Sequence, residues 1–121
     1  MSRTWLIVVL FVVSWPISGA IDALLGATEE LFPPTYLPHM LTISILSFAW
    51  CRVDVEANAF AMPRGSRILC AIAPPLGVPI HLYRTRPARR ATLATLKGAG
   101  IFALAFFSYD AAVYAVQALV A

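Results

Sequence analysis

The sequence is poor in charged residues. Only 12% of its 121 residues are charged, whereas a soluble domain carries about a quarter. Apolar residues make up 60% of the chain, and the mean hydropathy is +0.80. This composition excludes an ordinary soluble domain and predicts an integral membrane protein with almost no extramembrane part.

Motifs of common enzyme classes are also missing. The sequence contains no Walker loop, no dinucleotide-binding fingerprint, no HExxH and no GxSxG. Its two cysteines, Cys51 and Cys70, form no CxxC motif and are too few for a disulfide framework or a metal site. The net charge of +3 comes from basic residues between apolar runs, where they set membrane orientation. We therefore expect neither an enzyme nor a nucleic-acid-binding protein.

Four apolar segments divide the chain, at about residues 5–25, 37–51, 68–83 and 98–121. They predict an all-α integral membrane protein of three to four transmembrane helices, forming a single membrane domain over residues 1–121. The first segment resembles a signal peptide, but we interpret it as a retained helix. The abundance of arginine and alanine fits a GC-rich bacterial genome, so we expect a multi-pass protein of the bacterial inner (cytoplasmic) membrane.

The third segment, 68–83, is short and interrupted by Pro74, Pro75, Gly77 and Pro79. Arg3 places the N-terminus in the cytoplasm by the positive-inside rule. If the third segment spans as a kinked helix, the basic loop 84–97 lies outside, against that rule, and the C-terminus lies inside. If it re-enters, both basic loops stay inside and the C-terminus lies outside. Both arrangements remain open; we slightly favour the kinked span, because re-entrant segments are rare.

An acidic residue, Asp110, lies in the middle of the last apolar segment. An aspartate at the bilayer centre costs about 3 kcal/mol. Helical spacing places Tyr114 and Gln117 on the same face. A second polar stripe follows the first segment at four-residue spacing: Ser14, Ser18 and Asp22. We expect these stripes to fix helix packing or to contact a partner subunit. The alternative is a proton or cation path through Asp110, with Asp22 as a candidate second member.

Basic residues and histidines supply further candidate sites. Four arginines follow the third segment: Arg84, Arg86, Arg89 and Arg90. We expect them to anchor the chain, by binding phospholipid head groups or an acidic partner surface. His39 and His81 lie near segment ends, and imidazoles ligate haem iron or chlorophyll magnesium. Interfacial histidines without a ligand are the simpler interpretation. No cofactor is therefore certain; a bound lipid, haem and chlorophyll are the candidates.

The stretch AWCRVDVEANAFAMPRGSRILCAIAPPLGVPIHLYRTRP resembles a family of uncharacterised small polytopic bacterial inner-membrane proteins. In that family a tryptophan and an aspartate follow one helix, and a proline-containing helix ends in an aromatic-Arg-x-Arg signature. The matching positions are Trp50, Asp54, Arg67, Pro79, Tyr83, Arg84 and Arg86. The resemblance covers about a third of the chain. It implies no activity and assigns no functional residue.

The leading functional hypothesis is a small accessory subunit of a larger inner-membrane complex, respiratory or photosynthetic. The chain is almost entirely membrane-embedded, and a chain with so few helices has little protein of its own to cover Asp110. Its partners are then other membrane subunits of a hetero-oligomeric complex, together with phospholipid. One alternative is a homo-oligomeric small transporter or channel that uses Asp110. The other is a haem- or chlorophyll-binding membrane subunit that uses His39 or His81.

Overall fold

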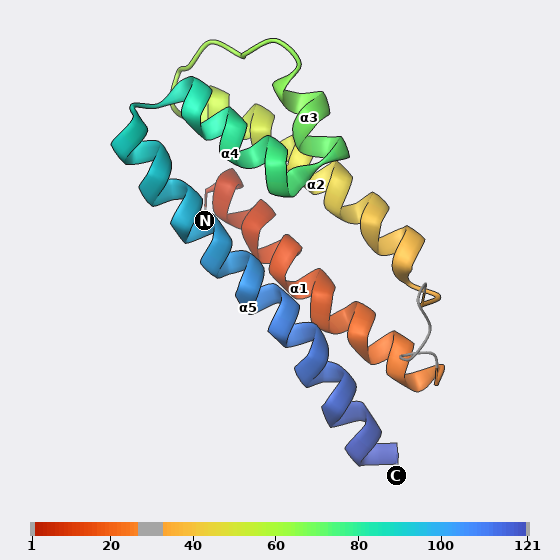
Figure 1. Ribbon diagram of the computed structural model, residues 1–121. Helices are drawn as coiled ribbons and strands as arrows, with labels where there is room; N and C mark the ends of the chain where they lie inside the picture. Colours follow the sequence, from red (N-terminus) through yellow and green to blue (C-terminus); the bar gives the residue numbers. More distant parts are fainter. Residues whose placement is uncertain (1, 27–32, 121) are drawn as a thin grey trace.

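The computed structural model, which describes residues 2–26 and 33–120, is built from helices (Figure 1). These are α1 (Arg3–Leu24), α2 (Tyr36–Ala57), α3 (Ser66–Ile72), α4 (Pro74–Thr85) and α5 (Ala88–Val120). The described residues contain no strand, which confirms the all-α prediction. Two of the helices, α1 and α5, are long and apolar enough to cross a membrane. The expected total of three to four spans stays a prediction.

The apolar side chains of α1 and α5 are mostly uncovered by protein. In the most apolar window of each helix, only 11% of the residues of α1 and 6% of those of α5 are buried. A helix that is apolar on all sides is normally buried in a large core or in a membrane. Among the described residues, few side chains cover these two helices, so most of their apolar surface is exposed.

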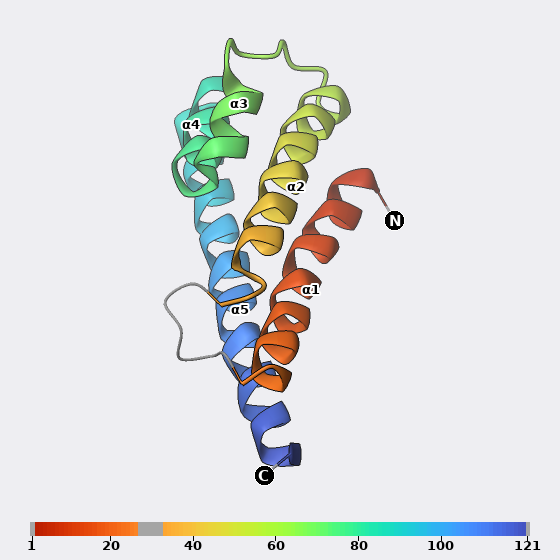
Figure 2. The ribbon, with the colours of Figure 1, turned by 90° about the vertical axis from the view of Figure 1, so that its right-hand side faces the viewer.

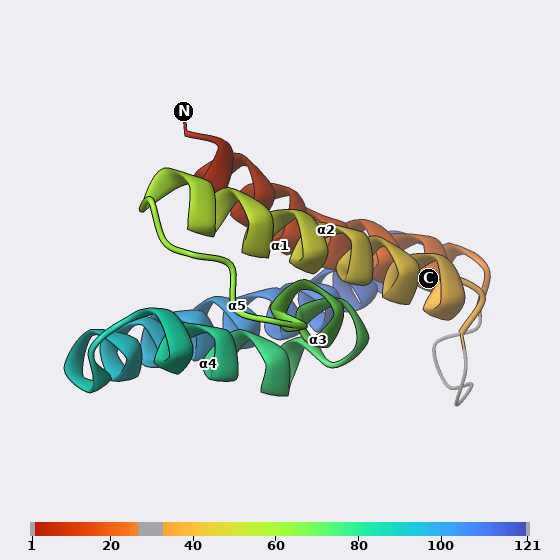
Figure 3. The same ribbon diagram turned by 90° about the horizontal axis from the view of Figure 1, so that it is seen from above.

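The helices pack in a closed ring. Each helix contacts the next one along the chain, and α5 returns to pack against α1. Seen from above, α1 and α2 lie together on one side of the molecule, and α4 and α5 on the other (Figure 3). Because α1 and α5 run in the same direction, the two termini lie toward opposite ends (Figures 1 and 2).

The third apolar segment is a helical hairpin, not one kinked helix. Ala73 separates α3 from α4 with non-helical backbone angles, because the following Pro74 disfavours helical geometry in the residue before it. The two helices pack so closely that a Cβ on Gly77 would stand 2.5 Å from the carbonyl oxygen of Leu69. In Figure 1, α4 returns to the end from which α3 started. The favoured kinked span is therefore wrong, and the chain doubles back as the alternative required.

Two helices are longer than the sequence predicts. α2 continues beyond residue 51 to Ala57, and α5 begins at Ala88 instead of Gly98. Residues 88–97 are mostly alanine, arginine, leucine, threonine and lysine, several of which favour helix, and Pro87 precedes the first turn. The predicted basic linker is therefore in large part the first three turns of α5.

The close approach at Gly77 yields a test of the hairpin. Gly77→Ala should destabilise the protein by about 1–3 kcal/mol, because the added methyl group meets the backbone of Leu69 and Cys70. The measurement is the unfolding of the purified protein in mild detergent under titration with a denaturing detergent. Gly98→Ala is the matched control, since nothing lies within 4 Å of its added Cβ; it should stabilise by about 0.5–1 kcal/mol. Equal effects at both positions would contradict the hairpin.

Candidate functional site

A buried carboxylate, Asp54, is the centre of a polar cluster at the end of α2. Both terminal nitrogens of Arg86 donate to it, Nη1 to Oδ2 over 3.0 Å and Nη2 to Oδ1. The Nε2–H of His81 donates to Oδ2 over 3.0 Å. The Asp54 side chain is 5% exposed and that of His81 is 0% exposed. The ion pair therefore ties the end of α4 to α2 inside the protein.

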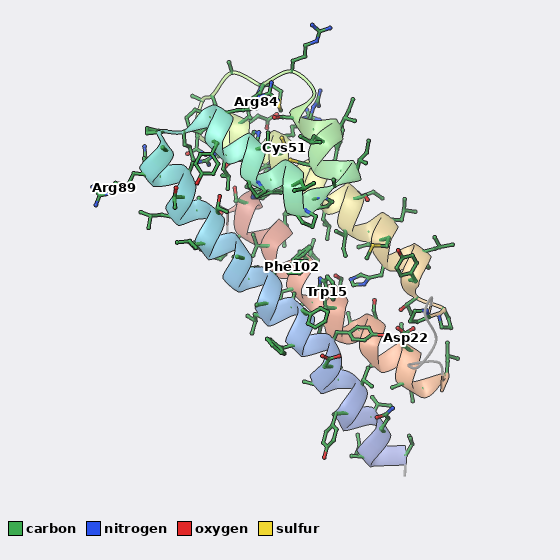
Figure 4. All side chains as sticks on the ribbon, viewed as in Figure 1. Trp15, Asp22, Cys51, Arg84, Arg89 and Phe102 are labelled. Carbon is green, nitrogen blue, oxygen red and sulfur yellow. The ribbon has the colours of Figure 1, made fainter. Side chains whose placement is uncertain are left out.

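The second ring nitrogen of His81 is also occupied. Its Nδ1 lies 3.1 Å from the Ser66 hydroxyl and 3.5 Å from the Cys51 sulfur. The Trp50 ring packs edge-on against the imidazole, with 5.6 Å between ring centroids. Figure 4 shows Cys51 close to α4, in the upper part of the molecule. We call these residues, Asp54, His81, Arg86, Ser66 and Cys51, the Asp54 cluster.

The electrostatics of the cluster favour a charged Asp54, which lies beyond the apolar segment 37–51. Burial alone would raise the pKa of this carboxyl group. The hydrogen bonds from His81 and Arg86, together with the positive charge of Arg86, outweigh burial and lower its pKa below the ordinary value. The pair of Asp54 and Arg86, which we call the Asp54 clamp, is therefore hydrogen-bonded as well as oppositely charged, the form in which a buried charge is tolerated.

A second cluster surrounds Asp22 at the other end of α1. The Thr35 backbone N–H and hydroxyl donate to Asp22 Oδ1 over 3.2 and 2.7 Å, and the Tyr109 hydroxyl donates to Oδ2. Gly19 lets α5 come close, because a Cβ there would stand 2.5 Å from the Tyr109 carbonyl oxygen. Asp22 thus joins α1, the start of α2 and α5.

Several aromatic rings pack together between the Asp54 cluster and the cluster around Asp22. Trp15 of α1 contacts the rings of His39, Phe102 and Phe106, and Figure 4 shows Trp15 next to Phe102. His39 is itself buried, and its Nε2 lies 3.1 Å from the Ser14 hydroxyl. The contact between Ser14 and His39 therefore links α1 to α2.

The predicted polar stripes meet only in part. Ser18 and Asp22 are buried and Ser14 is half-buried, as expected for a packing stripe. Their neighbour on α5, however, is Tyr109 and not Asp110. Asp110, Tyr114 and Gln117 are exposed. Adjacent residues of a helix point about 100° apart, so this stripe does not face α1, and its contact with a partner subunit stays a prediction.

The two histidines lie in different clusters and share no partner. His81 is enclosed beneath the hairpin with both nitrogens occupied, whereas His39 lies near the start of α2. Their use as haem or chlorophyll ligands stays a prediction.

The four arginines also separate. Arg86 is held by Asp54, and Arg84 donates to the Arg64 carbonyl oxygen over 3.1 Å. Arg89 and Arg90 are exposed at the start of α5. Figure 4 shows Arg84 and Arg89 at the same end of the molecule. Only part of the predicted basic run is therefore free to meet a head group.

The Asp54 cluster as a unit was not predicted from the sequence. His81 was considered as an interfacial histidine or a cofactor ligand, and Asp54 as a match to the resembling family. That family pattern does contain both Asp54 and Arg86, so it carried the one available signal. The pairing itself joins residues 32 positions apart, which no local spacing reveals.

The order Ser66, His81, Asp54 resembles a hydroxyl nucleophile with a base and an orienting acid. Ser66 is only 1% exposed, and Asp54 is already neutralised by Arg86. Within the described ranges, no group of three or more histidine, cysteine, aspartate or glutamate side chains is arranged to hold a metal ion. The contacts of Asp54 with His81 and Arg86 hold α2 and the end of α4 together.

Comparisons of the chain with protein-family models, with curated proteins and with solved structures yield no match. The resemblance to small inner-membrane proteins stays a prediction.

The Asp54 clamp predicts a pH-dependent stability. Because the folded pKa of Asp54 is lowered, its contribution is fully present above the unfolded pKa of about 4 and is lost as the pH falls through the folded pKa. Asp54→Asn should lower the free energy of unfolding by about 3–5 kcal/mol at pH 7. It should also make the free energy of unfolding fall less as the pH is lowered toward 2.5. The measurement is detergent-based unfolding between pH 2.5 and 7.

Glu56→Gln is the matched control for Asp54→Asn. Glu56 lies one half-turn further along α2 and pairs with Arg52, but both side chains are more than half exposed. Such surface pairs contribute about 0–1 kcal/mol, so the control should leave stability and its pH dependence nearly unchanged. Equal losses in the two variants would show that the Asp54 clamp does not hold the fold.

Proposed function

We propose that the chain is a small accessory subunit of a larger bacterial inner-membrane complex, respiratory or photosynthetic, with a structural and not a catalytic role. One observation carries the proposal. Asp22 and Asp54 have hydrogen-bond donors inside the chain, whereas Asp110 has none among the described residues and is exposed. An unpaired carboxylate in an apolar helix calls for a donor from another chain.

The position of Asp110 along α5 supports a place inside the membrane. It follows Lys97, the last basic residue, by thirteen positions, which corresponds to about 20 Å of helix. Its neighbour Tyr109 packs against Gly19, within the apolar length of α1. A charged aspartate facing lipid at such a depth costs about 2.5–3.5 kcal/mol. A hydrogen-bond donor on a partner helix offsets that cost.

The face that carries Asp110 points away from the rest of the chain. α5 packs on α1 around Ala105, which is 0% exposed. Five positions further along a helix, Asp110 points about 140° away from that contact. Tyr114, which is 78% exposed, and Gln117 continue the same face toward the C-terminus. This face is the surface on which we place the partner subunit.

The charge distribution supports a cytoplasmic N-terminus. All arginines and the lysine lie in four regions: the first turn of α1, the second half of α2, residues 58–87, which contain α3 and α4, and the first turns of α5. They are Arg3, Arg52, Arg64, Arg67, Arg84, Arg86, Arg89, Arg90 and Lys97. The hairpin brings these regions to one end of the molecule (Figure 1). We place that end in the cytoplasm by the positive-inside rule.

The other two hypotheses find less support in the geometry. A tetrapyrrole ligand role for His81 conflicts with its two occupied nitrogens and its complete burial. His39 has one nitrogen beside Ser14 and its ring against Trp15. A homo-oligomeric channel would also place Asp110 against protein, so the test below distinguishes it from a heteromeric complex.

Substitution of Asp110 tests the partner contact. After gentle detergent extraction, Asp110→Asn should still copurify with the partner subunits, because an amide retains a hydrogen-bonding oxygen. Asp110→Leu should lose most of that association while the chain itself stays folded. The readout is the amount of copurifying protein on native gels. Leu104→Ala, on another exposed part of α5, is the control and should retain the partner. A ladder of self-multiples alone would contradict the accessory-subunit proposal and favour the channel.

Reporter fusions test the orientation. A fusion at the N-terminus should report the cytoplasm and a fusion at the C-terminus the opposite side, because the hairpin returns to its starting end and leaves an odd number of crossings. Two termini on the same side of the membrane would contradict the proposed orientation.

A further inference from the structure

A hollow of about 340 Å³ lies between the start of α1 and the second half of α2. Figure 2 shows these two parts of the chain side by side. The residues that line it are Arg3, Phe48, Ala49, Arg52, Val53 and Glu56. It thus combines two guanidinium groups with apolar side chains and one carboxylate.

Both guanidinium groups have hydrogen-bond donors without a partner among the described residues. Arg52 donates from Nε to Glu56 over 3.1 Å, which leaves its two terminal nitrogens without a partner among the described residues. Arg3 forms no hydrogen bond or ion pair within those residues and is exposed. Because a guanidinium group binds phosphate through two parallel hydrogen bonds, the hollow suits a phosphate group.

Apolar surface continues from the basic groups. Phe48 is 40% exposed and lines the hollow, and the guanidinium of Arg67 stacks on its ring at 5.2 Å. Arg3 stands just before the apolar run of α1, and Arg52 directly follows the apolar segment 37–51. Along both helices, an arginine that can bind a head group therefore lies next to apolar surface suited to an acyl chain.

We propose that this hollow is a specific site for one anionic phospholipid, whose phosphate is held by Arg3 and Arg52 and whose acyl chain lies along α1 and α2. The proposal rests on the membrane placement given above but not on the partner subunit. It moves the expected head-group contact from Arg84, Arg86, Arg89 and Arg90 to the opposite flank of the basic end.

Lipid binding is measured on the purified full chain in detergent, by native mass spectrometry and by thermal stabilisation with added lipid. The probes are phosphatidylglycerol, phosphatidylcholine with the same acyl chains, and water-soluble glycerol phosphate. The test variant carries both Arg3→Gln and Arg52→Gln. The matched control, Arg89→Gln with Arg90→Gln, removes the same charge from the same end but outside the hollow.

The expected result is preferential binding of phosphatidylglycerol, weakened by at least about tenfold in the test variant and retained in the control. Glu56→Gln should strengthen binding, because it removes the carboxylate that competes for Arg52; misfolding cannot produce such a gain. Equal losses in test and control variants would show diffuse attraction and overturn the proposal. Equal binding of phosphatidylcholine, or an equal effect of glycerol phosphate, would also overturn it. Since the isolated chain is used, failure here leaves the partner proposal intact.

Discussion

The buried ion pair between Asp54 and Arg86 is the constraint on which the arrangement of the helices depends. A carboxylate enclosed by α2, α3 and α4 is tolerated only when its partners are present. Arg86 is the last residue of the chain before Pro87 and α5, so its position fixes where α5 begins. His81 adds a second contact from the middle of α4. The hairpin therefore returns to Asp54, and α5 starts from the end of the molecule where α1 starts.

This return explains how two basic regions far apart in the sequence share one end of the molecule. Without it, the segment that contains Arg89 and Arg90 would lie at the opposite end from Arg3. Asp54 and Glu56 are the only acids at this end among the described residues, and each is paired with an arginine. The remaining positive charge at this end is thus uncompensated by the described residues and is available to anionic surroundings.

The two long apolar helices were predictable, because composition over some twenty residues determines them. The proline breaks at residues 74, 75 and 79 were visible too, and they correctly marked the third segment as irregular. The direction of the chain after Ala73 was not, since it depends on contacts between Asp54 and residues 27 and 32 positions later. Which helix or subunit the α5 stripe faces was not predictable either, because the step from Tyr109 to Asp110 changes the direction around a helix by about 100°.

The contrast among the three aspartates is the strongest argument about function. Asp54 has an arginine and a histidine, and Asp22 has a threonine and a tyrosine, so the chain does provide donors where its own fold encloses an acid. Asp110 stands one residue from Tyr109 yet points about 100° away from it around α5. If it were neutralised by protonation alone, the cost of a lipid-facing carboxyl group would fall but its hydrogen-bonding groups would still be unsatisfied. A donor on a neighbouring chain satisfies both the charge and the hydrogen bonds, which is why the accessory-subunit proposal places the interface there.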